Sequence, residues 1–366
     1  MGNWPHSFIR VSDSLEENTM THFKLSRRQV LAGVGATLAA PAFVTRAQAA
    51  EVTLRLHHFL PPVAPMHSKF FVPWAQEIAD ASNGAIEVQI FPAMQLGGKP
   101  PQLADQVRNG IVDIAWALPT YTPGRYPVAE TMGLPFMVTN AEKTSVAVHK
   151  LMDEFGGSEF AGMKNLAFWS HDGGKLHMRD TAVRTAADLV GKKIRSPNSS
   201  VGELLASLGA EPVFFPVTEM VVGLSNGVID GCCLPYEVVP PFKLQELTKF
   251  SCEAAPGARG LYANTNTLLM NQKAYEGLSD DLRGVIDANS GIALSQRIGQ
   301  TFDQFEAVGR GMVQKANNEI VEIGSDEIAK WLEASQPVYA NWEKTLNDAG
   351  HDGAAIIARA NALLDA

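Results

Sequence analysis

The sequence has few cysteines and lacks the short motifs that mark the common enzyme classes. No HExxH or CxxC pattern gathers metal ligands, and no Gly-x-Ser-x-Gly marks a serine nucleophile. Neither Gly156-Gly157 nor Gly173-Gly174 has the spaced glycines and Lys of a phosphate-binding loop. We therefore predict a protein that is not an enzyme and holds no metal and no cofactor.

Three cysteines, at positions 232, 233 and 252, are too few for a disulfide-rich scaffold. Cys232 and Cys233 are adjacent and point to opposite sides of a strand, so they do not bridge each other. A bridge from either one to Cys252 remains possible in an oxidising compartment. We favour three buried free thiols.

Five histidines, at positions 57, 58, 67, 171 and 177, have no metal-binding spacing. His57 and His58 would face opposite sides of an extended chain. We interpret all five as single histidines that hydrogen-bond within loops.

Basic residues are scarce, and long apolar runs are almost absent. The chain has 30 Lys and Arg against 39 Asp and Glu, a net charge of −9. Such an acidic protein is a poor partner for nucleic acid or for an anionic membrane surface. A small anionic ligand is still compatible, because a local cluster of donors can outweigh the average charge.

The longest apolar run, residues 30–44, is too short to span a bilayer. It follows Arg27-Arg28 and precedes Ala47-Gln48-Ala49, so residues 1–49 have the three parts of an export signal. The Arg pair resembles a twin-arginine signal, although general secretory signals also contain such pairs, and either Met1 or Met20 could be the first residue. We predict a periplasmic protein cleaved near Ala49. Five basic and three acidic residues lie in this segment, so the remainder carries 25 basic and 36 acidic residues, a net −11.

One phrase occurs twice: "NGIVDIAWALP" from Asn109 and "NGVIDGCCLP" from Asn226. In each, Asn-Gly is typical of a helix end, and the β-branched pair that follows is typical of a strand. The hydrophobic periodicity around each copy of the phrase predicts alternating strands and helices. The expected strands are 52–56, 86–90, 111–117, 192–195, 212–215 and 228–234, with helices through 70–84 and 103–107, one starting near Ser200 in a capping box with Glu203, and one capped by Thr218.

These elements predict two α/β lobes. We expect residues 50–172 to form the first part of lobe 1, 173–260 lobe 2, and 261–300 a return to lobe 1. The tail from Ser279 has a helical pattern, so we expect residues 301–366 to be C-terminal helices that brace both lobes. Ligands of such sheets collect at the carboxyl ends of the parallel strands.

Arg195 is the leading candidate for a ligand contact. It ends the strand "KKIR", Pro197 stops that strand, and the helix near Ser200 directs free N–H groups to the same place. A guanidinium beside a helix N-terminus is suited to a carboxylate. The alternative is a surface Arg paired with a nearby acid.

Four segments in this order resemble a known family. "DLVGKKIRSPNSSVGELLASLGAEPVFFPVTEMVVGLSNGVIDGCCLPYE" is similar to the central segment of the periplasmic solute-binding proteins of tripartite ATP-independent (TRAP) transporters, the DctP-like family. "FPAMQLGGKPPQLADQVRNGIVDIAWALPTYTPGRYPVAETMGLPFM" and "LLMNQKAYEGLSDDLR" resemble its other parts, and the resemblance covers residues 51–345. It implies a receptor that closes on a small organic acid and delivers it to TRAP membrane permease subunits, with Arg195 on the ligand's carboxylate.

Because of two departures from some sialic-acid-binding relatives, the ligand need not be a sugar acid. Leu234 stands where such relatives have Asn, and Lys175 stands where they have a second Arg, with Arg179 nearby. Some relatives that bind α-keto acids hold a cation with the ligand, so a cation remains an alternative here.

The resemblance implies an α/β, two-lobed periplasmic binding protein (type II-like) with a hinge. We predict that its ligand is a compact monocarboxylate with an apolar body, namely a 2-hydroxy, 2-keto or aromatic acid, preferred over succinate or malate and bound by a monomer. The rival is a twin-arginine-exported enzyme with a cofactor or metal. The predicted ligand-binding residues are Arg195, Tyr236, Trp116, Phe215, His58, Phe59, Leu234, Lys175, Arg179 and Glu237.

Overall fold

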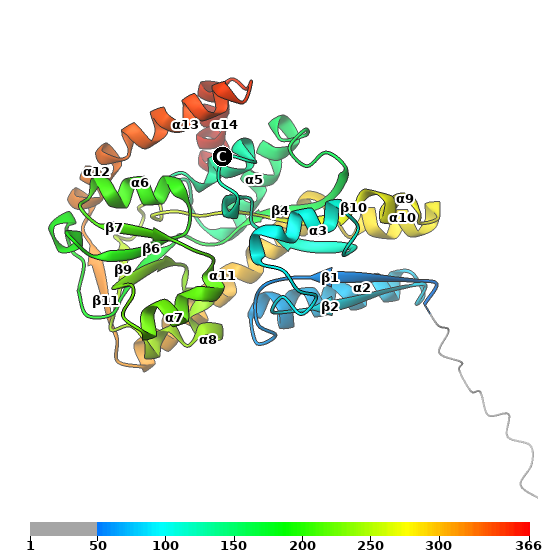
Figure 1. Ribbon diagram of the computed structural model, residues 1–366, viewed down its shortest axis with the longest axis horizontal. Helices are drawn as coiled ribbons and strands as arrows, with labels where there is room; N and C mark the ends of the chain where they lie inside the picture. The colour runs from blue at the N-terminus through cyan, green and yellow to red at the C-terminus, as the bar shows by residue number, and fades with distance from the viewer. Residues whose placement is uncertain (1–49) are drawn as a thin grey trace, which may run out of the picture. The chain divides into compact units, whose positions relative to one another are not determined.

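The computed structural model describes residues 50–366, which form two mixed β-sheets covered by helices (Figure 1). The predicted export signal, residues 1–49, lies outside the described residues. Within 50–366, no helix is both long enough and apolar enough to cross a membrane.

The first sheet has the strand order β2-β1-β3-β10-β4. Its first three strands are parallel, and β10 runs antiparallel to both of its neighbours. The strands are β1 (Val52–His57), β2 (Ile86–Phe91), β3 (Ile114–Ala117), β4 (Met163–Ser170) and β10 (Thr265–Asn271). The main helices beside them are α2 (Val72–Ala81), α3 (Leu103–Arg108) and α5 (Ala141–Phe155). We call this part lobe 1.

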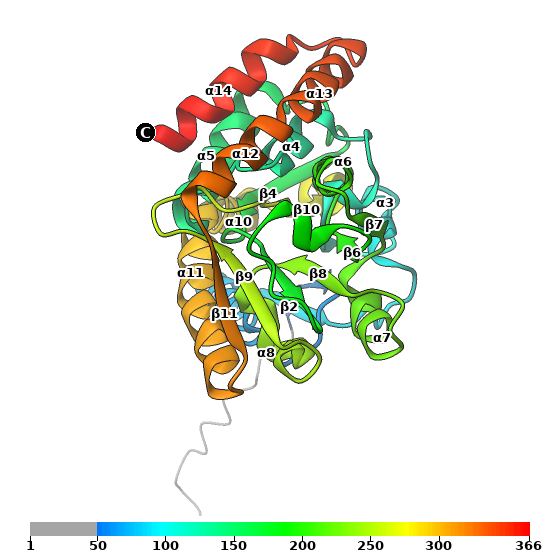
Figure 2. The same cartoon turned by 90° about the vertical axis from the view of Figure 1, so that its left-hand side faces the viewer.

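The second sheet has the order β11-β9-β5-β8-β6-β7, and here β5 is the antiparallel strand (Figure 2). The strands are β5 (Lys175–Met178), β6 (Lys193–Ser196), β7 (Glu211–Phe214), β8 (Gly231–Leu234), β9 (Phe250–Ala254) and β11 (Glu319–Ile323). Its helices include α6 (Ser199–Ser207) and α7 (Met220–Ser225). This part is lobe 2, and the two-lobed α/β fold predicted from the sequence is confirmed.

The repeated phrase forms the same corner in both lobes. Helices α3 and α7 end at Asn109 and Asn226, and the following glycines have φ of 69° and 66°. The repeated Asp also has one role: Asp113 accepts the backbone N–H of Arg55 at 2.9 Å, and Asp230 accepts that of Lys193 at 2.8 Å. Each carboxylate thus joins its corner to the neighbouring parallel strand.

Two segments cross between the lobes, residues 171–174 from β4 to β5 and 255–264 from β9 to β10. They touch where Gly173 meets Gly260, since a Cβ on Gly173 would lie 2.7 Å from the Gly260 Cα. Tyr262 O accepts the N–H of Gly174 at 2.8 Å, which joins the crossings further. Larger residues at these glycines would push the two crossings apart.

Helix α11 (Gly291–Lys315) is a third link between the lobes, roughly 37 Å long at 1.5 Å per residue. It packs on α5 through Gly299 and on the backbone of Tyr236 through Gly309. Helices α12 (Ser325–Ala334), α13 (Gln336–Asp348) and α14 (Gly353–Asp365) then cover both lobes, α14 against α5 and α13 against α6 (Figure 2).

Three local predictions were wrong. The cap of α6 is Asn198, whose side chain accepts the Val201 N–H at 2.8 Å, so the Ser200–Glu203 capping box does not form. Thr218 lies within a short 3₁₀ turn, because the chain begins to coil one residue earlier, at Val217. The tail predicted to be helical contains β11, whose alternating "EIVEI" pairs in parallel with β9.

Buried ionisable groups make the stability of this fold depend on pH. Burial lowers the pKa of His58 and His177 to about 3 in the folded protein. Their contribution to the free energy of unfolding is therefore fully present above pH 6.5, the usual pKa of His in an unfolded chain, and declines as the pH falls toward 3. Burial raises the pKa of Glu130 to about 8 and that of Glu159 to about 7. Their contribution to the free energy of unfolding is therefore fully present below about pH 4.5 and is lost as the pH rises to 8. We expect the free energy of unfolding, measured by urea titration, to peak between about pH 4.5 and 6.5.

Glu130→Gln is the matched variant for this pH dependence. It removes one titrating carboxyl, so the decline between pH 6.5 and 8 should become shallower. A free energy of unfolding that rises steadily from pH 6.5 to 8 in the unmodified protein would contradict the assignment.

Candidate ligand-binding site

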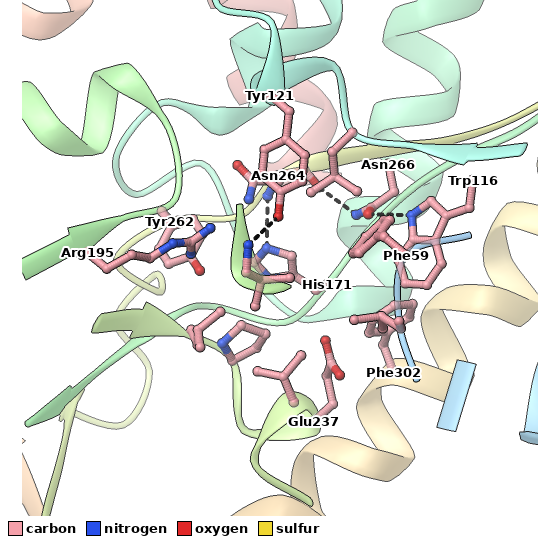
Figure 3. A pocket seen from close by; sticks show the side chains of 16 residues that line it. Phe59, Trp116, Tyr121, His171, Arg195, Glu237, Tyr262, Asn264, Asn266 and Phe302 are labelled. Atoms are coloured by element: carbon pink, nitrogen blue, oxygen red, sulfur yellow. Dashed lines mark hydrogen bonds between the residues drawn. The ribbon is translucent and has the colours of Figure 1, made fainter. Parts of the chain in front are cut away.

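A cavity lies between the lobes, beside the crossings and the strand ends (Figure 3). Its empty volume, which includes space open to solvent, is about 430 Å³. The residues around it come from both lobes, from both crossings and from α11. They are Phe59, Leu60, Trp116, Leu118, Tyr121, His171, Arg195, Val217, Leu234, Pro235, Glu237, Val238, Tyr262, Asn264, Asn266 and Phe302.

Arg195 reaches the cavity from β6 and is only 2% exposed. Its Nε donates to Phe215 O at 3.0 Å and its Nη1 to Cys233 O at 3.4 Å. These carbonyls stand just beyond β7 and within β8, so the parallel strands on either side of β6 fix the guanidinium. Three of its five N–H groups remain for another acceptor. No carboxylate within residues 50–366 forms an ion pair with it.

Two further donors lie near this guanidinium. Tyr121 Oη accepts the N–H of Val217 at 3.1 Å, which leaves its own hydroxyl proton available. The Asn264 Oδ1 accepts from Asn198 at 3.0 Å, and its Nδ2 has no hydrogen-bond acceptor in the described part of the chain. Burial raises the pKa of Tyr121 despite the nearby charge of Arg195, so the phenol stays protonated.

His171 supports this group as a neutral ring. Burial lowers its pKa to about 4, and the charges of Lys175 and Arg195 act in the same direction. Its Nδ1 lies 2.6 Å from Asp172 O and its Nε2 accepts the N–H of Asn264 at 3.1 Å. The carbonyl can only accept, so Nδ1 carries the proton, and the ring orients Asn264.

The opposite side of the cavity is aromatic. The rings of Phe59 and Trp116 lie 4.6 Å apart, and Phe302 of α11 stands beside them (Figure 3). Trp116 Nε1 donates to Asn266 Oδ1 at 2.9 Å, which satisfies its only polar group and fixes the ring. A guanidinium at one end and an aromatic wall at the other suit an amphipathic acid.

Five of the ten predicted site residues line the cavity. They are Arg195, Trp116, Phe59, Leu234 and Glu237. Arg195 and Trp116 lie on strands at the sheet edges predicted to face the ligand. Leu234 is the last residue of β8, and Phe59 and Glu237 lie in the segments that follow β1 and β8.

The structure does not bring the other five to the cavity. His58 contacts His67, with Nε2 and Nδ1 2.9 Å apart, behind Trp116. Tyr236 turns away to donate to Glu253 Oε2 at 2.9 Å, and Phe215 contributes its carbonyl rather than its ring.

Lys175 and Arg179 are absent from the lining for different reasons. Lys175 is bound to Asp172 and Glu306, so its charge is already neutralised. Arg179 lies beside Gly227, at the far end of β5, where the repeated corner begins. Neither is a second cation for the ligand in this arrangement.

Several lining residues were missed, and some had a usable signal. Asn264 and Asn266 stand at the start of β10, which is antiparallel to β3 and β4, so this start lies at the same sheet edge as the carboxyl ends of those two strands. His171 directly follows β4, and Tyr121 lies in the short turn that follows β3. Phe302 is indistinguishable from core residues of a long amphipathic helix.

The structure also places the three cysteines. Cys232, Cys233 and Cys252 are buried and free, as favoured, and burial raises the pKa of Cys232 and Cys252 to about 12. Among residues 50–366, no three His, Cys, Asp or Glu side chains are grouped as a metal site.

Comparison with known proteins assigns the family. Residues 56–345 match the model of the bacterial extracellular solute-binding proteins of family 7, DctP. The C4-dicarboxylate-binding periplasmic protein DctP of Rhodobacter capsulatus is 27% identical over 86% of this chain and 93% of its own. The chain therefore belongs to the DctP family, and its resemblance to TRAP solute-binding proteins is confirmed.

Two solved structures are nearer in sequence. A TRAP solute-binding protein from a marine metagenome, specific for aromatic acid ligands and crystallised with 3-hydroxybenzoate, is 43% identical, with a TM-score of 0.84 over 87% of this chain and 99% of that one. A TRAP solute-binding protein of Rhodoferax ferrireducens with copurified benzoate is 39% identical, with a TM-score of 0.84 over 86% and 98%.

Proposed function

We propose that this protein is the periplasmic receptor of a TRAP transporter for a small aromatic monocarboxylate of the benzoate type. The observation that carries the proposal is the arrangement of the cavity: the Arg195 guanidinium at one end, and the Phe59 and Trp116 rings at the other.

The carboxylate end is defined by unpaired donors. A buried guanidinium needs an ionic or hydrogen-bonding partner, since an unpaired buried charge costs several kcal/mol. The free N–H groups of Arg195 can bind both oxygens of one carboxylate, and Tyr121 and Asn264 can add one bond each. These donors together provide enough hydrogen bonds for one carboxylate group.

The aromatic end favours a ring. Phe59, Trp116 and Phe302 offer flat apolar surfaces, on which an aromatic body gains both burial and ring–ring contact. The two relatives above, which bind 3-hydroxybenzoate and benzoate, support the same class of ligand.

A C4-dicarboxylate is the main rival, because of the Rhodobacter capsulatus relative. Its second carboxylate would need a second cation. Arg195 is the only Lys or Arg among the cavity-lining residues, and Lys175 is occupied by two acids. The charge of the cavity therefore favours a monocarboxylate.

We infer that the receptor acts as an exported monomer, cleaved near Ala49, and that it presents its ligand to the membrane permease. The acidic surface charge and the family support this role. An exported enzyme remains the alternative from the sequence, but no arrangement of residues in 50–366 favours it.

A thermal-unfolding screen tests the proposal. Benzoate and 3-hydroxybenzoate should raise the melting temperature more than succinate or malate, because a ligand at about 100 times its Kd adds about 2.7 kcal/mol of stability. Phenol, which has the ring but no carboxylate, is the matched control and should give no shift. Stabilisation by succinate or malate alone would refute the proposal.

A further inference from the structure

Glu237 is a second polar group inside the cavity, apart from the carboxylate end. It lies on the turn Tyr236–Val238, is only 6% exposed, and directs its carboxyl group into the cavity (Figure 3). No hydrogen bond from its carboxyl oxygens to another residue of 50–366 is present, whereas its backbone N–H donates to Glu306 Oε2 at 3.0 Å. Its side chain is thus buried, aimed at the ligand space and without a protein partner in the described chain.

The surroundings of Glu237 are acidic. Glu306 binds Lys175, and Lys175 also donates to Asp172 Oδ1 at 2.9 Å, so the nearest cation already serves two carboxyl groups. Burial and then the charge of Glu306 raise the pKa of Glu237 well above its usual range, with Lys175 opposing. Arg195 does not contribute, which agrees with its position at the other end. In its protonated form the Glu237 carboxyl group can donate one hydrogen bond and accept others.

We propose that Glu237 selects aromatic acids that carry a hydroxyl group on the ring, by exchanging a hydrogen bond with that hydroxyl while Arg195 holds the carboxylate. The inference rests on the proposed function and deepens it. It names Glu237 as a specificity residue and hydroxybenzoate-type acids as the substrate class.

Two physical reasons favour a hydroxyl group over the alternatives. Bare benzoate would leave the buried carboxyl group of Glu237 without a partner, and an unsatisfied buried polar group is unfavourable. A second carboxylate would bring a negative charge beside Glu237 and Glu306, with no free cation among the lining residues. A phenolic hydroxyl is uncharged at neutral pH and can both donate and accept, so it satisfies Glu237 at no charge penalty.

The structure also separates this role from a purely structural one. The side chain of Glu237 makes no hydrogen bond within residues 50–366, and its position is fixed through its backbone by Glu306. Replacing the side chain should therefore leave the unliganded protein as stable as before. A structural role would instead predict a loss of stability in every variant at this position.

The test is calorimetric titration of benzoate, the three hydroxybenzoate isomers and benzene-1,3-dicarboxylate. The variants are Glu237→Gln, which keeps a neutral donor and acceptor, and Glu237→Leu, which keeps bulk only. Glu327→Gln is the matched control, because Glu327 is a buried Glu outside the cavity. We expect the wild type to bind its best hydroxybenzoate about tenfold more tightly than benzoate, as one hydrogen bond allows, and the dicarboxylate more weakly than either.

In Glu237→Leu the preference for a hydroxybenzoate over benzoate should fall to about onefold, because the ring hydroxyl loses its partner and benzoate no longer leaves a buried carboxyl group unsatisfied. Glu237→Gln should keep most of the preference, and Glu327→Gln all of it. If the wild type and Glu237→Leu prefer hydroxybenzoate over benzoate equally, the inference is wrong. Binding of benzoate by the wild type would still support the proposed function. Failure of the wild type to bind any of the aromatic acids refutes the proposed function, and the inference with it.

Discussion

Replacing Arg195 with Ala should weaken benzoate binding by about 2 to 5 kcal/mol, or roughly 30-fold to several thousandfold. The loss is large because the guanidinium is 2% exposed and a ligand carboxylate would stay buried without its ion partner. Isothermal titration at neutral pH measures the effect directly.

Arg195→Lys should also bind poorly. The planar guanidinium donates to the carbonyls of Phe215 and Cys233 and still has N–H groups for the ligand, whereas one ammonium cannot serve both sides. Arg184→Lys is the control, since Arg184 is an exposed lobe 2 residue paired with Glu319. Affinity within twofold of wild type in both Arg195 variants would move the carboxylate site elsewhere.

The sequence was sufficient to predict the two lobes because local signals and the global fold agree. Asn109-Gly110 and Asn226-Gly227 each close a helix, and the Asp that follows joins the corner to the next strand in both lobes. The helix end and the start of the strand depend on neighbouring residues only, so the sequence pattern alone predicts them. The alternating "EIVEI" of β11 was missed because it is short and interrupts a long helical region.

The site could be predicted only in part, for a physical reason. Arg195 sits on a strand whose end must face the ligand, so sequence position is informative. The direction of a loop side chain depends instead on contacts from distant residues. Tyr236 turns toward Glu253, and His58 packs behind Trp116, because of partners that strand and helix patterns do not reveal.

The two crossings between the lobes also could not be predicted from local sequence patterns. His171, Tyr262 and Asn264 lie on segments with no regular periodicity, and the close approach of Gly173 to Gly260 brings these segments together. Glycines at 173 and 260 are visible in the sequence, but their meeting requires both lobes to be placed. His171, Tyr262 and Asn264, three of the residues missed by sequence reasoning, lie where the two lobes join.

Lys175 gives the sharpest contrast between the sequence-based interpretation and the structure. As a ligand contact, its loss would weaken binding and leave stability unchanged. In the structure Lys175 and Glu306 are each only 12% exposed at the side chain, and Lys175 also binds Asp172. Although burial lowers the pKa of Lys175, the charges of Glu306 and Asp172 outweigh it, so the pKa is raised and the ammonium persists.

Lys175→Met should therefore lower the free energy of unfolding by about 3 to 5 kcal/mol, because it leaves buried acids without their cation. Lys249→Met, which breaks an exposed pair with Asp180, is the matched control and should change stability far less. The double variant Lys175→Met, Glu306→Gln lacks one of the acids that Lys175→Met leaves unpaired. Its loss of unfolding free energy should therefore be smaller than the sum of the losses in the two single variants. Urea titrations of the wild type, Lys175→Met, Glu306→Gln and the double variant provide this cycle. If Lys175→Met unfolds like wild type but binds benzoate much more weakly, then Lys175 contacts the ligand, and the buried ion pair does not stabilise the junction between the lobes.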